Sequence, residues 1–171
     1  MPRYIAFLRG VSPLNAKMPE LKACFESAGF TNIRTVLSSG NVVFDSIHAE
    51  PSVIEKIAED SMSKMLGRTF YTIVRSTKEL EGILATDLYA EHGIPSGTKR
   101  VVSFFRESPQ SKLALPLAQD QASVFLVQGR EAYTAYIPSA NGPVFMNLIE
   151  KAFGKSVTTR TLETVAKCAA A

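Results

Sequence analysis

The sequence predicts an α+β fold of two tandem ferredoxin-like (βαββαβ) units, each with an antiparallel sheet and helices packed on one face. Strand-like and helix-like segments follow the order β-α-β-β-α-β within the first 76 residues, and the same order recurs less regularly from residue 99. The length of 171 residues suits one domain or two small units that share a core. We therefore expect a first unit at residues 1–76, a connecting helix and loop at 77–98, and a second unit with a C-terminal helix at 99–171.

In the first unit, β-rich apolar runs predict strands, and Gly and Pro mark the ends of helices. Pro19 suits the first position of a helix that ends at Gly29. Ser52 and Glu55 have the spacing of a capping box for a second helix, which ends at Gly67. The predicted strands of this unit cover residues 4–8, 31–37, 41–45 and 70–74.

The second half of the chain is read in the same way. Ser76 and Glu79 have the spacing that caps the connecting helix. Strands are predicted at residues 100–105, 123–127, 132–137 and 156–158, and helices at 108–115 and 145–152. A last helix follows, with Thr158 or Thr161 as its cap.

Composition limits the function classes. Nearly half of the residues are hydrophobic and a fifth are charged, which is typical of a globular protein. No apolar run approaches the ~20 residues that span a bilayer, and the N-terminus lacks the pattern of a signal peptide. We therefore expect a cytoplasmic protein with no membrane partner. The net charge of +3 permits an anionic partner but is too small to indicate nucleic acid.

The histidines and cysteines do not indicate a metal or cofactor site. His48 and His92 are isolated, with no second ligand at helical or CxxC spacing. Cys24 lies on the apolar face of a predicted helix and Cys168 lies close to the C-terminus, so we expect two reduced thiols. No cofactor and no metal are predicted.

The turn at residues 38–41 is the first candidate site. A three-residue hairpin with Gly40 in the left-handed conformation explains the glycine and a tolerant Asn41. It does not explain two consecutive serines, Ser38 and Ser39. Their hydroxyls and the N–H groups of the turn are suited to an anion or another polar ligand, so both a plain turn and a binding turn stay open.

The loop from Arg9 to Lys17 is the second candidate, because it joins a strand to the start of a helix. Helix N-termini attract anions, and the two cations would add charge. The loop lacks the P-loop pattern, and Pro13 removes one N–H donor. An ordinary loop with solvated cations is the alternative.

A third polar stretch, residues 158–161, precedes the last helix. One cap does not need three threonines, so Thr159 and Arg160 are candidates for a second anion site, with the guanidinium as a bidentate partner for phosphate or carboxylate. Capping together with a surface arginine is the alternative.

Catalytic patterns such as G-x-S-x-G, H-E-x-x-H or a Cys-His pair do not occur. An enzyme acting on a nucleotide would need an acid that binds a metal, and Asp45 is the close candidate in sequence. Phe125, Tyr133 and Tyr136 alternate along a hairpin as in RNA-binding sheets. They lack the basic-Gly-Phe signature, so core packing explains them better and nucleic acid is not favoured.

Three strings, FLRGV, LSSGNVVF and GKSVTTRTLETVAK, resemble a bacterial family, number 1697 of the domains of unknown function. The resemblance runs from Met1 to about Lys167 and implies an α+β fold of two ferredoxin-like units, a dimer and no established activity. This chain departs from the family pattern in its shorter loop at residues 10–17. It also has Leu162 where members usually carry Trp.

The leading hypothesis is a module that binds an anionic, phosphate-bearing small ligand or a partner. The alternatives are an enzyme that acts on a nucleotide or phosphorylated substrate and a structural homodimer. The predicted ligand-binding residues are Arg9, Lys17, Ser38, Ser39, Gly40, Asn41, Thr159 and Arg160.

Overall fold

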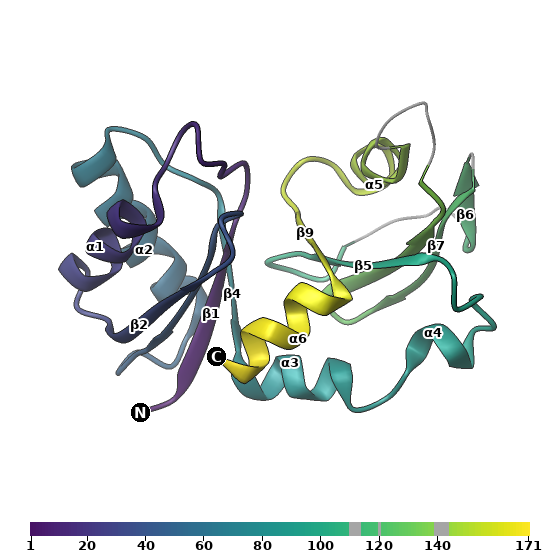
Figure 1. Ribbon diagram of the computed structural model, residues 1–171, viewed down its shortest axis with the longest axis horizontal. Helices are drawn as coiled ribbons and strands as arrows, with labels where there is room; N and C mark the ends of the chain where they lie inside the picture. Colours follow the sequence, from purple (N-terminus) through teal and green to yellow (C-terminus); the bar gives the residue numbers. More distant parts are fainter. Residues whose placement is uncertain (110–113, 120, 139–143) are drawn as a thin grey trace. The chain divides into compact units, whose positions relative to one another are not determined.

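A computed structural model describes residues 1–109, 114–119, 121–138 and 144–171 (Figure 1). The chain has a mixed α+β fold with two antiparallel sheets and helices, which confirms the general class predicted. It divides into two compact units. Unit 1 contains Met1–Leu84 together with Val165–Ala171, and unit 2 contains Ala85–Thr164.

The sheet of unit 1 has four strands in the order β2-β3-β1-β4, and every neighbouring pair is antiparallel. The strands are β1 (Arg3–Leu8), β2 (Thr31–Val36), β3 (Asn41–Asp45) and β4 (Thr72–Ser76). The two central strands, β1 and β3, are almost wholly buried because their apolar residues face the core on both sides. This order places the end of β1 beside the start of β3, with Phe7 opposite Asn41.

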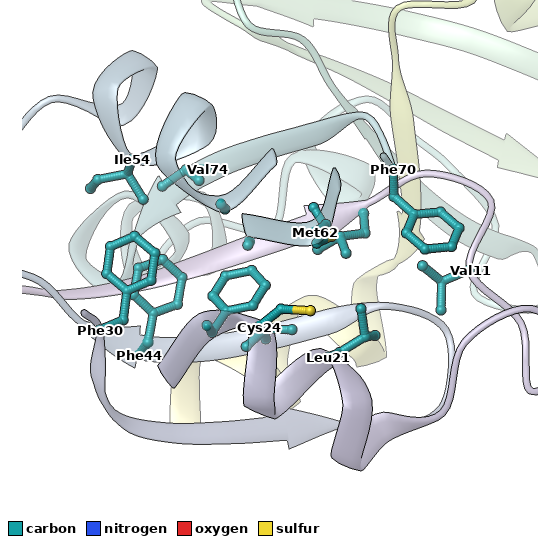
Figure 2. Packing of buried hydrophobic residues seen from close by; sticks show 14 of the residues in the cluster. Val11, Leu21, Cys24, Phe30, Phe44, Ile54, Met62, Phe70 and Val74 are labelled. Atoms are coloured by element: carbon teal, nitrogen blue, oxygen red, sulfur yellow. The ribbon is translucent and has the colours of Figure 1, made fainter. Parts of the chain in front are cut away.

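Helices α1 (Met18–Ser27) and α2 (Pro51–Leu66) pack on one face of this sheet. The core between them is aromatic, and Figure 2 shows Phe30 and Phe44 side by side, to the left of Cys24 in this view. The ring centroids of Phe30 and Phe44 are 4.5 Å apart, and those of Phe25 and Phe44 are 5.3 Å apart. Such ring pairs add about 1 kcal/mol beyond the area they bury. Gly29, with φ +94°, and Gly67, with φ +69°, end the two helices as predicted.

The other face of the same sheet is buried along three of its four strands, β3, β1 and β4. Ile5, Phe7, Val43 and Ile73 have no exposed surface, and helix α3 (Thr77–Leu84) packs against β1 and β4. The hydroxyl of Ser76 accepts the N–H of Glu79 at 3.1 Å, so the predicted cap of this helix is confirmed.

Side chains cap the outer edge of β4. Its outward N–H groups at Thr72 and Val74 donate to the carboxylates of Glu59, at 3.3 Å, and Glu55, at 2.9 Å. Glu55 and Glu59 are four residues apart in the helix, a rise of about 6.0 Å. Thr72 and Val74 are two residues apart in the strand, a rise of about 6.7 Å. Each carboxylate can therefore reach one N–H of the strand. The guanidinium of the fully buried Arg75 donates to the carbonyl of Val74 at 3.1 Å. The edge of β4 is therefore protected against pairing with another strand.

The hydrogen bond from Val74 to Glu55 shows that the capping box predicted for α2 is wrong. The N-cap of α2 is Glu50, which makes no side-chain cap hydrogen bond, and Ser52 lies inside the helix. Glu55 turns toward the sheet because the unpaired N–H of a buried edge strand needs an acceptor more than an exposed helix end does.

The sheet of unit 2 has the order β6-β7-β8-β5-β9 and is antiparallel throughout. Its strands are β5 (Lys99–Phe104), β6 (Leu117–Gln119), β7 (Ala122–Gln128), β8 (Glu131–Tyr136) and β9 (Thr158–Thr161). Helix α5 (Val144–Phe153) covers one face, where Leu148 and Ile149 pack against Val124 and Ala132. Helix α6 (Leu162–Ala170) follows β9, and Cys24 and Cys168 are free and buried.

Several elements differ from the sequence prediction. The short helix α4 (Leu88–Glu91) and strand β6 were not predicted, and β4 and β9 begin two residues later than expected. The middle of the predicted helix at 108–115, residues 110–113, lies outside the described residues. The sequence grouped the C-terminal helix with the second unit, whereas Val165–Ala171 lie in unit 1. None of the described helices has the length and hydrophobicity to cross a membrane.

Candidate functional site

The two polar segments of the first unit meet at one end of its sheet. The N–H of Leu8 donates to the carbonyl of Gly40 at 2.9 Å, and the N–H of Arg9 donates to the carbonyl of Tyr71 at 2.9 Å. These contacts join residues 9–17, the turn at 37–41 and the segment 67–71, which together we call the loop end of unit 1. In Figure 1 the connections β1–α1 and α2–β4 lie at this same end. The arrangement brings together Arg9, Lys17, Ser38, Ser39, Gly40 and Asn41.

The hairpin between β2 and β3 has a four-residue turn, Leu37 to Gly40, instead of the three-residue turn expected. Leu37 and Gly40 both have positive φ, +60° and +87°. A Cβ on Gly40 would lie 2.9 Å from the Cβ of Val11 and 3.1 Å from that of Leu8. Gly40 is therefore required twice, by its backbone conformation and by the loop that packs on it.

Asn41 holds this turn together. It is fully buried, and its amide nitrogen donates to the carbonyl of Val36 at 2.9 Å and to the hydroxyl of Ser39 at 3.1 Å. Asn41 therefore has a structural task, whereas Ser38 and Ser39 are exposed at the surface of the turn.

The loop at residues 10–17 is held by its own polar groups. The side chain of Asn15 accepts the N–H of Ser12 at 2.9 Å and donates to the carbonyl of Gly10 at 2.8 Å. The start of α1 is less open to an anion than expected. Glu20 accepts the N–H of Lys17 at 3.5 Å, and Pro19 has no N–H to offer. An anion at this end must therefore be bound mainly by side chains.

The loop end carries an excess of positive charge. Arg9 is half-buried, and Lys17 is exposed. Sequence reasoning missed Arg68, which follows the stop signal of α2 and is exposed at the same end, and Lys64 in the last turn of α2. Within the part of the chain that the structure describes, Lys17, Lys64 and Arg68 form no ion pair. The signal for Arg68 was available, because βαββαβ topology puts the α2–β4 connection beside the end of β1.

Thr159 and Arg160 belong to unit 2 and lie in β9, not in a helix-start loop. The hydroxyl of Thr159 is 2.8 Å from that of Ser103, and the guanidinium of Arg160 donates to the carbonyl of Thr159 at 2.9 Å. Thr161 accepts the N–H of Thr164 at 3.2 Å and is the cap of α6. The three threonines are thus divided between sheet packing and one cap, which accounts for the excess noted in the sequence.

Asp45, the acid considered for metal-assisted chemistry, lies at the opposite end of β3 from the turn. Its carboxylate forms an ion pair with Arg3 at 2.9 Å and accepts from Asn32 at 3.3 Å. Partial burial opposes ionisation, but the hydrogen bonds from Arg3 and Asn32 and the charges of Arg3 and the N-terminus outweigh it and lower the pKa of Asp45. Asp45 is engaged in holding the start of β1.

This shift predicts how acid acts on the fold. Because the pKa of Asp45 is lower in the folded state, the ionised carboxylate stabilises the fold at pH values above its unfolded pKa of about 3.9. This stabilisation is lost as the pH falls through the pKa of the folded state. We expect Asp45→Asn to be less stable than wild type at pH 6, with the difference shrinking toward pH 2. Urea unfolding across this range measures it. Asp60→Asn is the control, because Asp60 pairs with Lys56 on the surface and its effect should be small at every pH. A constant deficit for Asp45→Asn would contradict the assignment.

The aromatic residues of the second hairpin are packed rather than presented to solvent, as the sequence indicated. Tyr133 is buried, with its ring 6.2 Å from that of Tyr89, and Tyr136 stacks on Phe145 at 4.2 Å. Burial, with the charge of Glu131, raises the pKa of Tyr133 to about 12. Phe125 packs edge-on against Tyr89 at 5.2 Å. Among the described residues, no three His, Cys, Asp or Glu side chains gather as they would around a metal ion.

Comparison with known proteins gives a family and a fold. A family model described as "Protein of unknown function (DUF1697)" matches residues 1–133. The structure is similar to that of the conserved bacterial protein SP0830 from Streptococcus pneumoniae, with a TM-score of 0.73 and 15% sequence identity over 99% of this chain and 97% of that chain. At this identity the likeness shows a shared fold. No curated protein matched the chain.

Proposed function

The chain belongs to this family of proteins of unknown function, and we propose that it is a binding module whose loop end of unit 1 holds an anionic, phosphate-bearing group. The observation that carries the proposal is the meeting of the two polar segments at Gly40 and Val11. It places exposed serine hydroxyls in the same loop end as Lys17 and Arg68, with Lys64 in the adjoining last turn of α2, and these three cations have no acidic partner among the described residues.

The chemistry of this end suits a phosphate oxygen better than a reacting centre. Lysine binds phosphate as a point charge, arginine binds it through two parallel N–H donors, and serine hydroxyls complete the shell. Two acids on the helices next to the loop end already accept backbone hydrogen bonds. Glu20 accepts a backbone N–H of α1, and Glu59 accepts one of β4. These contacts support a binding module more than an enzyme, because a general acid or base at this end would have to leave its present partner.

A titration with inorganic phosphate, pyrophosphate, polyphosphate and nucleotides tests this proposal. A bound anion at ~100 times its dissociation constant adds ~2.7 kcal/mol to the free energy of unfolding. We expect at least one of these anions to raise the melting temperature, both at low salt and at near-physiological salt. The shift should be lost in Lys17→Glu and in Arg68→Glu.

Lys56→Glu is the matched control, since Lys56 is an exposed cation of α2 that pairs with Asp60 away from the loop end. A shift that survives both loop-end variants, or that Lys56→Glu removes equally, would contradict the site. A contribution of Thr159 and Arg160 in unit 2 stays a prediction, and Arg160→Ala in the same titration measures it.

The finer architecture is part of the proposal. The order β2-β3-β1-β4 of unit 1 supports a ferredoxin-like unit, and the order β7-β8-β5-β9 within unit 2 repeats it, with β6 added at one edge. The predicted homodimer and cytoplasmic location likewise stay predictions. The capped edge of β4 argues against pairing through that strand, and light scattering of the purified chain measures the oligomeric state.

A further inference from the structure

Three large apolar side chains are exposed close to Lys17, Lys64 and Arg68, which form no ion pair among the described residues. Leu14 is 98% exposed, Leu37 is 50% exposed and Met65 is 49% exposed. They come from the loop at residues 10–17, the turn at 37–40 and the last turn of α2. Lys17, Lys64 and Arg68 lie in the same or neighbouring segments. Apolar and cationic side chains are thus interspersed at one end of unit 1.

Both leucines are presented by ordered backbone. The N–H of Leu14 donates to the hydroxyl of Ser12 at 3.3 Å, within the loop that Asn15 ties together. Leu37 has φ +60°, a conformation that costs a branched residue roughly 1–2 kcal/mol and that Gly or Asn would adopt more easily. Half of the Leu37 side chain stays in water, so a leucine adds little stability to set against the strain of this turn, and such outliers gather at functional surfaces.

The partner that fits this surface is anionic and apolar at once. A bound peptide needs a strand edge or a groove. The edge of β4 is capped by Glu55 and Glu59, and β2, the other outer strand, pairs irregularly with β3 between Thr31 and Arg34. The exposed leucines stand on connecting loops. A lipid surface requires no matching shape, and it binds apolar side chains surrounded by cations.

We propose that the loop end of unit 1 docks on an anionic lipid surface, with Leu14 and Leu37 entering the headgroup region and Lys17, Lys64 and Arg68 contacting phosphates. This inference rests on the proposed anion binding and names the source of the phosphate. It departs from the expectation of no membrane partner, which was drawn from the lack of a spanning segment. A docking surface needs no spanning segment.

Co-sedimentation with vesicles tests the inference. Wild type should bind vesicles that contain phosphatidylglycerol and not vesicles of phosphatidylcholine alone. Leu14→Ser and Leu37→Asn should each weaken vesicle binding by about tenfold, the loss expected when a leucine no longer leaves water. Leu37→Asn should do so without lowering the melting temperature, because asparagine tolerates the left-handed conformation. Ile47→Ser is the control, since Ile47 is 78% exposed but follows the far end of β3.

A parallel titration with pyrophosphate separates this inference from the proposed function. If wild type binds pyrophosphate but not anionic vesicles, the lipid surface is wrong and the anion site stands. If vesicle binding is unchanged in both leucine variants, or falls equally in Ile47→Ser, docking through these leucines is overturned. If neither pyrophosphate nor vesicles bind, both proposals fail together.

Discussion

Replacing Gly40 with alanine is expected to destabilise unit 1 by about 2–5 kcal/mol, because two separate costs add. A non-glycine residue held at φ +87° costs about 1–2 kcal/mol. The new Cβ would also meet the Cβ of Val11 at 2.9 Å and that of Leu8 at 3.1 Å. Overpacking of this kind typically costs about 1–3 kcal/mol. Urea unfolding measures the sum.

Gly10→Ala separates the two costs. Gly10 has φ +83°, but nothing lies within 4 Å of the position that its Cβ would take. We expect this control to lose only the conformational part, about 1–2 kcal/mol. Equal losses for the two variants would show that the contact between the turn and the loop contributes nothing. That result would contradict the inference that packing of Gly40 against Val11 and Leu8 holds the two polar segments together.

Glu55→Ala is expected to have the second large effect, a loss of about 3 kcal/mol. Glu55 is 4% exposed, and its carboxylate accepts the N–H of Val74 at 2.9 Å. Truncation leaves a buried donor without its acceptor, which costs about 1–3 kcal/mol, and it also removes packed methylenes. The amide proton of Val74 should exchange faster with solvent in this variant, because the edge of β4 opens locally.

Two further variants should lose less stability than Glu55→Ala. Glu55→Gln keeps an acceptor oxygen and should lose less than Glu55→Ala. Glu59→Ala removes a longer and less buried contact to Thr72, at 3.3 Å, and should cost about 1 kcal/mol. Wild-type stability in Glu55→Ala, or unchanged exchange at Val74, would contradict the role given to the carboxylate.

Local sequence signals predicted most of the fold. Gly29, Gly67, Ser76 and Thr161 mark helix ends where the chain has them, because these signals depend only on neighbouring residues. The role of Glu55 could not be read in this way. Its spacing from Ser52 imitates a capping box, and the N–H that it accepts comes from a strand formed later in the chain. Helix α4 and strand β6 were missed because both are very short.

The candidate site was predicted only in part, because some of its features depend on contacts between residues distant in the sequence. The sequence identified both polar segments, and the fold brings them together through Gly40. It could not show that Asn41 is fully used within the turn, or that Glu20 and Pro19 limit the start of α1. Arg68 was overlooked because an arginine after a helix stop carries no local pattern, and only the topology gives it neighbours.

The most direct test of anion binding at the loop end is an amide NMR titration of the full chain with pyrophosphate. We predict that the signals that shift at the lowest concentrations belong to residues 10–17, 37–41 and 67–71, and that these shifts persist at near-physiological salt. Shifts confined to unit 2, or no shifts at concentrations that saturate ordinary phosphate sites, would contradict the proposed function.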